Sequence, residues 1–171
     1  IWRINDWTGT PSGFKNADLM TYAHPSDSRA AAWTGNVVIG SGTETSAFPC
    51  YIWKDVNSGL LVYFKLTAAQ AAAAHTLRIG VTDAFANGRP RVTVNDWVSA
   101  PPAAVTQPST RSLTVGSYRG NNHTFTYSVP ASAWLTDTSA YNTLKIYVAS
   151  GSGSTSFLSA GTSIDAIDLL S

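Results

Sequence analysis

Apolar and polar residues alternate with a period of two over much of the chain. In the segment Leu61–Leu66, the apolar residues Val62, Phe64 and Leu66 would share one face of a strand, and we expect them in the core. The same alternation recurs in Leu77–Thr82, Arg91–Asn95, Thr124–Val129 and Leu144–Val148. Further strand candidates are Ile1–Trp7, Val37–Ile39 and Ile164–Leu170. Together they predict about eight to ten short strands.

Gly, Pro, Asn and Ser clusters separate these strands, and a helical period is almost absent. This pattern predicts an all-β fold, an antiparallel β-sandwich or jelly roll, over residues 1–171 as one domain. One short helix is expected at Thr67–His75, because Thr67 and Gln70 have capping-box spacing and alanines follow. Pro101, Pro102 and Pro108 predict a long surface loop within the domain, since proline is excluded from central strands.

The composition favours neither a nucleic-acid nor a membrane partner. Charged residues make up 12% of the 171 residues, about half the usual share, and the formal net charge is +1. No apolar run approaches the roughly 20 residues of a membrane-spanning helix. Cys50 is the only cysteine, so no disulfide can form within the chain, and we expect it to be a small buried residue. The chain starts at Ile1 and would be a mature or excised form of a secreted protein; Asn122-His123-Thr124 is a glycosylation sequon, which predicts an exposed Asn122.

Known catalytic motifs are missing from the sequence. It contains no Gly-x-Ser-x-Gly elbow, HExxH motif, P-loop or Cys–His pair with metal-ligand spacing. Glu44 is the only glutamate, and no local context marks a pair of aspartates for glycosidase chemistry. A dispersed Ser-His-Asp triad remains an open alternative, because its members can be distant in sequence.

Three polar loops contain the candidate binding residues, each with an arginine beside turn-forming residues and near a strand end. An arginine fork can hold a carboxylate or two neighbouring hydroxyls, asparagine adds donors and acceptors, and an aromatic ring can stack on a sugar. The predicted carbohydrate-binding residues are Asp27, Arg29, Arg89, Trp97, Tyr118, Arg119, Asn121 and Asn122. The alternative is that the arginines pair with Asp27, Asp83 or Asp96 and only stabilise the loops. Among the tryptophans, Trp2, Trp7 and Trp53 are expected in the core, and Trp97 and Trp134 are the candidates for exposure.

Several of these segments, in order along almost the whole chain, carry a resemblance to a known family. They are Ile1–Ile4, Asp6-Trp7, Gly9–Pro11, Phe14, Asn16–Asp18, His24–Arg29, Leu77–Gly80, Gly88–Pro90, Tyr118–Asn122 and Ile164–Leu169. With these motifs the chain resembles the C-terminal, third domain of fungal-type rhamnogalacturonan lyases of polysaccharide lyase family 4.

The resemblance implies a galactose-binding-like jelly roll that binds a polysaccharide or oligosaccharide of the plant cell wall, without catalysis, because the lyase chemistry of that family lies in a separate N-terminal domain. No cofactor is required, although a structural calcium is allowed, since Asp165 is similar to an aspartate that serves such a site in related sugar-binding modules. Two alternatives stay open: a structural domain that docks onto a catalytic domain of the same parent chain, and a small polysaccharide-degrading enzyme.

Overall fold

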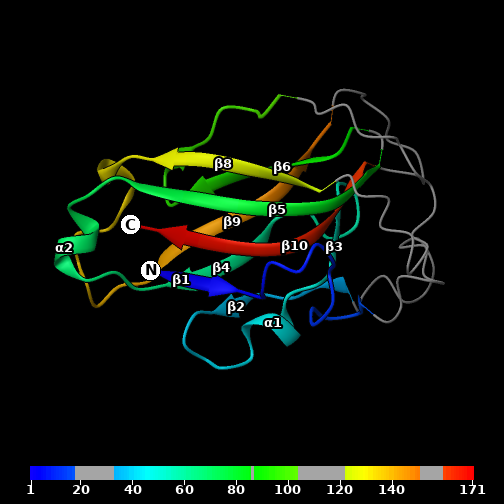
Figure 1. Cartoon of the computed structure of the whole chain (residues 1–171). Helices are drawn as coiled ribbons and strands as arrows, with labels where there is room; N and C mark the ends of the chain where they lie inside the picture. Colours follow the sequence, from blue (N-terminus) through cyan, green and yellow to red (C-terminus); the bar gives the residue numbers. More distant parts are fainter. Residues whose placement is uncertain (18–32, 86, 104–121, 151–159) are drawn as a thin grey trace.

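The chain forms two β-sheets packed face to face, as the alternating pattern predicts (Figure 1). The computed structural model describes residues 1–17, 33–85, 87–103, 122–150 and 160–171. Of the predicted site residues, Asp27, Arg29, Tyr118, Arg119 and Asn121 lie outside the described residues.

Sheet I has the strand order β1-β10-β5-β8, with β3 also paired to β10. Its strands are β1 (Trp2–Ile4), β3 (Tyr51–Trp53), β5 (His75–Phe85), β8 (His123–Val129) and β10 (Gly161–Leu170). Sheet II has the order β2-β4-β9-β6-β7. Its strands are β2 (Val37–Val38), β4 (Leu60–Phe64), β6 (Arg89–Val94), β7 (Trp97–Val98) and β9 (Asn142–Ala149). All described pairs are antiparallel except β2 with β4, which run parallel.

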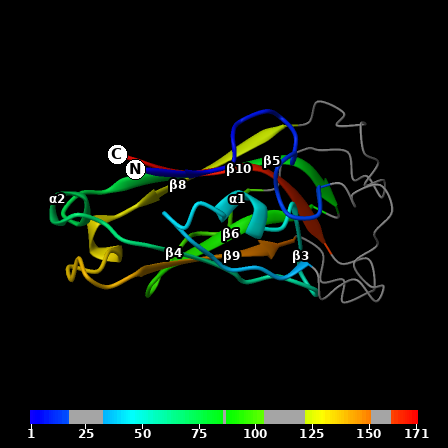
Figure 2. The same ribbon diagram turned by 90° about the horizontal axis from the view of Figure 1, so that it is seen from below.

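The two layers are visible edge-on in Figure 2, with β10 and β5 in one layer and β4, β9 and β6 in the other. Inward-facing residues of both sheets form the core, and Val62, Phe64 and Leu66 are all buried there, which confirms the predicted strand face. Cys50 is also buried, as expected of a small apolar side chain.

Helices are very short in the part of the chain that the structure describes. The predicted capping box of Thr67 and Gln70 is present, but the helix α2 covers only Ala68–Ala71, and His75 already belongs to β5. The alanines after Ala71 do not extend the helix because the chain must turn into this long central strand of sheet I. A second helix, α1 (Glu44–Ala47), was not predicted; it lies beside β1 and β2 in Figure 1. A 3₁₀ turn at Ala131–Ala133 completes the helical elements described.

Strand β10 is buried on both faces over nearly its whole length, so its outer face needs a cover. The segment after β1 supplies it. Trp7 lies on the outer face of sheet I over Gly80, where a Cβ would come within 2.6 Å of the indole ring. Gly80 is therefore required by the close approach of the ring. The expectation that Trp7 lies in the core is wrong, whereas Trp2 and Trp53 are core residues as predicted.

A buried carboxylate fixes this cover. Asp168 accepts hydrogen bonds from Arg78 Nε at 2.9 Å and Nη2 at 2.7 Å, from Trp7 Nε1 at 3.0 Å and from Arg3 at 3.3 Å. The Arg78 guanidinium also stacks over the Trp7 ring, 4.9 Å from its centroid. Burial alone raises the pKa of Asp168, but the hydrogen bonds from Arg78 and Trp7 and the charge of Arg78 outweigh it and lower the pKa below its usual range.

The carboxylate of Asp165 holds the next turn of the same segment. Its Oδ1 accepts from the backbone amides of Thr8 at 3.1 Å and Gly9 at 3.0 Å. These two amides fix the turn at Thr8 and Gly9 against β10. The described residues contain no group of three or more His, Cys, Asp or Glu side chains that could hold a metal, and the structural calcium that the resemblance allows stays a prediction.

Truncation of a core residue tests the strand assignment. Phe64 is 1% exposed, so Phe64→Ala should lower the free energy of unfolding by about 3–5 kcal/mol through lost burial and a cavity. The neighbouring Lys65→Ala removes an exposed cation–π contact with Tyr141 and should cost less than about 1 kcal/mol. Urea denaturation measures both, and a loss below about 1 kcal/mol for Phe64→Ala would show that the face is assigned wrongly.

The Asp168 network predicts an acid-sensitive fold. Because the folded-state pKa is lowered, its contribution to stability is present above the unfolded value of about 3.9 and is lost as the pH falls through the folded value. Asp168→Asn should be less stable near neutrality and should show a shallower fall in urea midpoint between about pH 5 and pH 2. Equal slopes in the two proteins would contradict this assignment.

Candidate carbohydrate-binding site

The two edges of the sandwich are closed in different ways. At the edge formed by β1 and β2, the segment around α1 connects the sheets, and Thr45 Oγ1 accepts a hydrogen bond from the amide of Asn5. At the opposite edge, β8 of sheet I faces β6 and β7 of sheet II across a pocket. This pocket is the candidate site.

The β6–β7 hairpin positions Trp97. A two-residue connection, Asn95-Asp96, joins the strands, and Asn95 has a left-handed φ of 50°, which asparagine tolerates well. Asn95 is bonded to Ala133 O at 2.8 Å and to Asn142 Oδ1 at 2.9 Å, so the turn is held firmly. Trp97 lies opposite the buried Val94, and its ring therefore points toward the space between the sheets, where it is half-buried.

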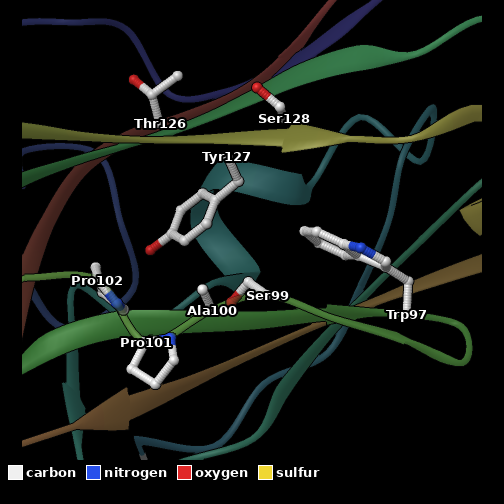
Figure 3. Close-up of a pocket in the computed structure, with 8 residues that line it drawn as sticks. All are labelled: Trp97, Ser99, Ala100, Pro101, Pro102, Thr126, Tyr127 and Ser128. Atoms are coloured by element: carbon white, nitrogen blue, oxygen red, sulfur yellow. The ribbon is translucent and has the colours of Figure 1, made fainter.

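Tyr127 forms the other side of the pocket (Figure 3). It lies on β8, is 6% exposed, and donates its hydroxyl hydrogen to Pro90 O on β6, so one hydrogen bond ties the two sheets together at this edge. Burial raises the pKa of this hydroxyl well above its usual range, and Tyr127 stays neutral at all ordinary pH values.

The pocket has a volume of about 310 Å³, at the lower end of the range for small-ligand sites. Its lining residues are Trp97, Ser99, Ala100, Pro101, Pro102, Thr126, Tyr127 and Ser128. They combine an indole ring, the phenol ring of Tyr127 and two proline rings, whereas Thr126 and Ser128 project from the side of β8 opposite to Tyr127 (Figure 3). Among the described lining residues there is no carboxylate, imidazole, amine or guanidinium. This set can cover the apolar face of a ring, and the described lining contains no group suited to proton transfer near neutral pH.

Arg89 supports the wall of the pocket. Its Nε donates to Pro102 O at 2.6 Å and its Nη1 to Asn87 O at 3.0 Å. The preceding Gly88 is required by packing, because a Cβ there would come within 2.3 Å of Gly161 O. The motif Gly88-Arg89-Pro90 thus joins β6 to β10 and holds the proline segment; the guanidinium points to backbone carbonyls and to no described aspartate.

Asn122 is exposed, as its sequon predicts, but its contact is with another segment: its side-chain amide lies 3.5 Å from Gly9 O. Of the described site residues, the structure therefore places Trp97 in the pocket and Arg89 behind its wall, and its contacts do not bring Asn122 to them. The expectation of exposure fails for Trp134, which is buried and donates to Ala73 O at 2.9 Å. Sequence reasoning missed Tyr127, Ser128 and the two prolines as site residues; the alternation of β8 marks Tyr127 only as inward-facing.

The fold and this pocket define the class: a β-sandwich domain with an uncharged aromatic pocket at one open edge. Residues 1–169 match the family model described as "CBM-like: Polysaccharide lyase family 4, domain III". The chain belongs to this family, which confirms the resemblance.

Fungal rhamnogalacturonate lyases are its relatives. The chain is 42% identical over 169 residues to rhamnogalacturonate lyase A of Emericella nidulans, and 39% identical over 170 residues to that of Aspergillus aculeatus. Each alignment covers 99% of this chain and 31% of the relative, so the chain spans about a third of the length of these proteins. A solved latent aurone synthase structure matches with a TM-score of 0.34 at 14% identity, over 72% of this chain and 26% of that chain, which supports no inference. No helix among the described residues has the length and apolarity to cross a membrane.

Replacing Arg89 tests its supporting role. Arg89→Ala removes two hydrogen bonds to backbone carbonyls, one of them at the pocket wall, and should lower the free energy of unfolding by about 1–3 kcal/mol. Arg89→Lys keeps the charge but not the fork, and should recover only part of the loss. Thermal melting measures both variants; an unchanged melting temperature for Arg89→Ala would favour a role in direct ligand contact.

Proposed function

We propose that the chain is a non-catalytic carbohydrate-binding domain that recognises a pectic polysaccharide of the plant cell wall, rhamnogalacturonan or another acidic glycan, outside the producing cell. The observation that carries the proposal is the pocket at the β7/β8 edge, built from Trp97, Tyr127 and two prolines, in a chain of a CBM-like family. Its relatives are rhamnogalacturonate lyases, and this chain spans only a part of them.

The indole of Trp97 gives the pocket a stacking surface of the size of one sugar ring. A sugar has a C–H face, which this indole can cover. The half-buried indole is already fixed by its hairpin and by packing against the core, so little side-chain freedom is lost on binding.

The described lining residues of the pocket are suited to binding a glycan and not to cleaving it. General acid–base catalysis needs a side chain whose pKa lies near the working pH, within hydrogen-bond reach of the substrate. Among the lining residues that the structure describes, only Tyr127 can ionise, and its raised pKa and its bond to Pro90 O keep it neutral. In a lyase that contains such a domain, the domain would hold the polymer while a different part of the chain cuts it.

Binding to rhamnogalacturonan oligosaccharides, measured by isothermal titration calorimetry, tests the pocket. Trp97→Leu should weaken binding by about 1–2 kcal/mol, or roughly 5- to 30-fold, through loss of the stacking surface. Trp134→Phe replaces a buried tryptophan that contacts Phe64 and His75 and should leave affinity unchanged. If wild-type protein binds no pectic or xylan oligosaccharide, while it associates with a separately produced lyase domain, the docking alternative takes the place of this proposal.

Incubation with rhamnogalacturonan, pectin or xylan should yield no new unsaturated or reducing chain ends. Absorbance of unsaturated uronic acid and a reducing-sugar assay measure this directly. Product formation that disappears when a residue of this chain is replaced would establish an enzyme and exclude the non-catalytic proposal.

A further inference from the structure

Charge is distributed unequally between the two sheets. The strands of sheet II contain Arg89, Arg91 and Lys145 and no aspartate or glutamate. On the outer face of sheet I, by contrast, Arg3 and Arg78 are both paired with Asp168. The outer face of sheet II is therefore positive, whereas that of sheet I is largely neutralised.

The cations of sheet II point outward. Exposure alternates along β6 and β9, and the residues with outward side chains include Arg91, Lys145 and Tyr147. Arg91 lies directly opposite Tyr147, with its guanidinium 5.7 Å from the ring centroid, and Lys145 is exposed in the middle strand, opposite Thr93 on one side and Leu61 on the other. Within the described part of the chain, neither Arg91 nor Lys145 has a carboxylate within ion-pair distance.

Aromatic and apolar side chains accompany these cations. Tyr63 on β4 lies opposite Thr143, which is four residues along β9 from Tyr147. Along the strand direction the two tyrosines are therefore about 13 Å apart, and Lys145 lies between them. Val38 and Val98, on the edge strands β2 and β7, pair with Tyr63 and Thr93 on this same face and are 38% and 51% exposed. A sheet face that only meets solvent does not require exposed tyrosines and valines beside cations without acids in the same strands. This face is therefore a candidate interaction surface.

We propose that the outer face of sheet II, formed by Arg91, Lys145, Tyr63 and Tyr147, is an extended binding surface for an anionic, uronic-acid-containing polysaccharide chain. Arg91 and Lys145 contact carboxylates, and the tyrosine rings cover the C–H faces of sugar units between them. A flat sheet face accommodates a run of sugar units, whereas the edge pocket holds one ring, so the two surfaces are separate. The inference rests on the proposed function and adds to it a second surface, with the residues that would contact the carboxylates.

The test compares polygalacturonate with the same polymer after methyl esterification, which keeps the backbone and removes the charge. The double variant Arg91→Gln/Lys145→Gln should bind polygalacturonate about tenfold or more weakly, since charge-assisted hydrogen bonds are lost, and should bind the esterified polymer like wild type. Raising the salt from about 0.1 M to 1 M shortens the screening length from about 10 Å to 3 Å and should weaken wild-type binding to polygalacturonate only. Affinity electrophoresis or calorimetry measures these differences.

Arg3→Gln is the matched control, because it removes one exposed positive charge from the opposite face. It should change polygalacturonate affinity less than about twofold, as expected for a screened, distant charge. Melting temperatures of the sheet II variants should stay within about 2 °C of wild type, since both side chains point outward and the hydrogen bond that is lost, from Arg91 Nε to Ser99 O, is long at 3.4 Å. Should Arg91→Gln perturb folding, Lys145→Gln alone and the charge-retaining Arg91→Lys carry the comparison.

The outcomes separate the two proposals. If wild-type protein binds rhamnogalacturonan oligosaccharides but the double variant binds polygalacturonate normally, or Arg3→Gln has an equal effect, the sheet II surface is wrong and the proposed function stands. If wild-type protein binds no glycan, charged or neutral, both fail.

Discussion

Burial of β10 on both faces is the constraint on which the rest of the structure depends. The strand pairs with β1, β3 and β5, so it links segments from the beginning, the middle and the end of the chain. Its inner face packs on sheet II, but its outer face bears Asp165 and Asp168, which cannot be buried without partners. The N-terminal segment supplies them as backbone amides, the indole of Trp7 and the side chain of Arg3, and β5 adds Arg78. Once that side is covered, the outer face of sheet I has few groups left to offer a ligand.

The sequence predicts the strands well where one face of the strand is exposed to solvent and the other is buried. In β4, β6, β8 and β9 alternation is regular, and Val62, Phe64 and Leu66 lie where the pattern puts them. It fails for β3, Tyr51–Trp53, because all three residues are buried and no alternation remains, and for β7, because two residues make no pattern. Trp7 was assigned to the wrong environment, and Trp134, a candidate for exposure, proved to be buried, for a similar reason. A tryptophan near a loop can be buried by a distant strand, and one in an apolar stretch can lie on the outside of a sheet over a glycine.

The candidate site was predictable only in part. Trp97 could be chosen from the sequence because it follows a turn, but Tyr127 and the Pro101-Pro102 wall join it through the pairing of β8 with one sheet and of β7 with the other, which sequence spacing does not specify. Arg89 was chosen for its guanidinium fork, and the fork is present, yet its acceptors are the carbonyls of Pro102 and Asn87. The tertiary structure decides which acceptors lie nearest to the guanidinium, so the sequence could not show that they are these backbone carbonyls and not a carboxylate.

The outer faces of the two sheets differ in charge because one of them is covered by another segment of the chain. Sheet I is covered by the chain's own N-terminal segment, so the cations on its outer face are held by the buried carboxylate that the cover requires. The outer face of sheet II has no such cover in the described part of the chain, and its strands have no acid to neutralise Arg91 and Lys145. Two cations without a carboxylate partner add little to folding, because an exposed cation–π contact such as that of Arg91 with Tyr147 contributes only about 0.5–1 kcal/mol. A role in binding an anionic chain accounts for this arrangement, and it needs no movement of the core, since Arg91, Lys145, Tyr63 and Tyr147 all lie on the outer face of sheet II.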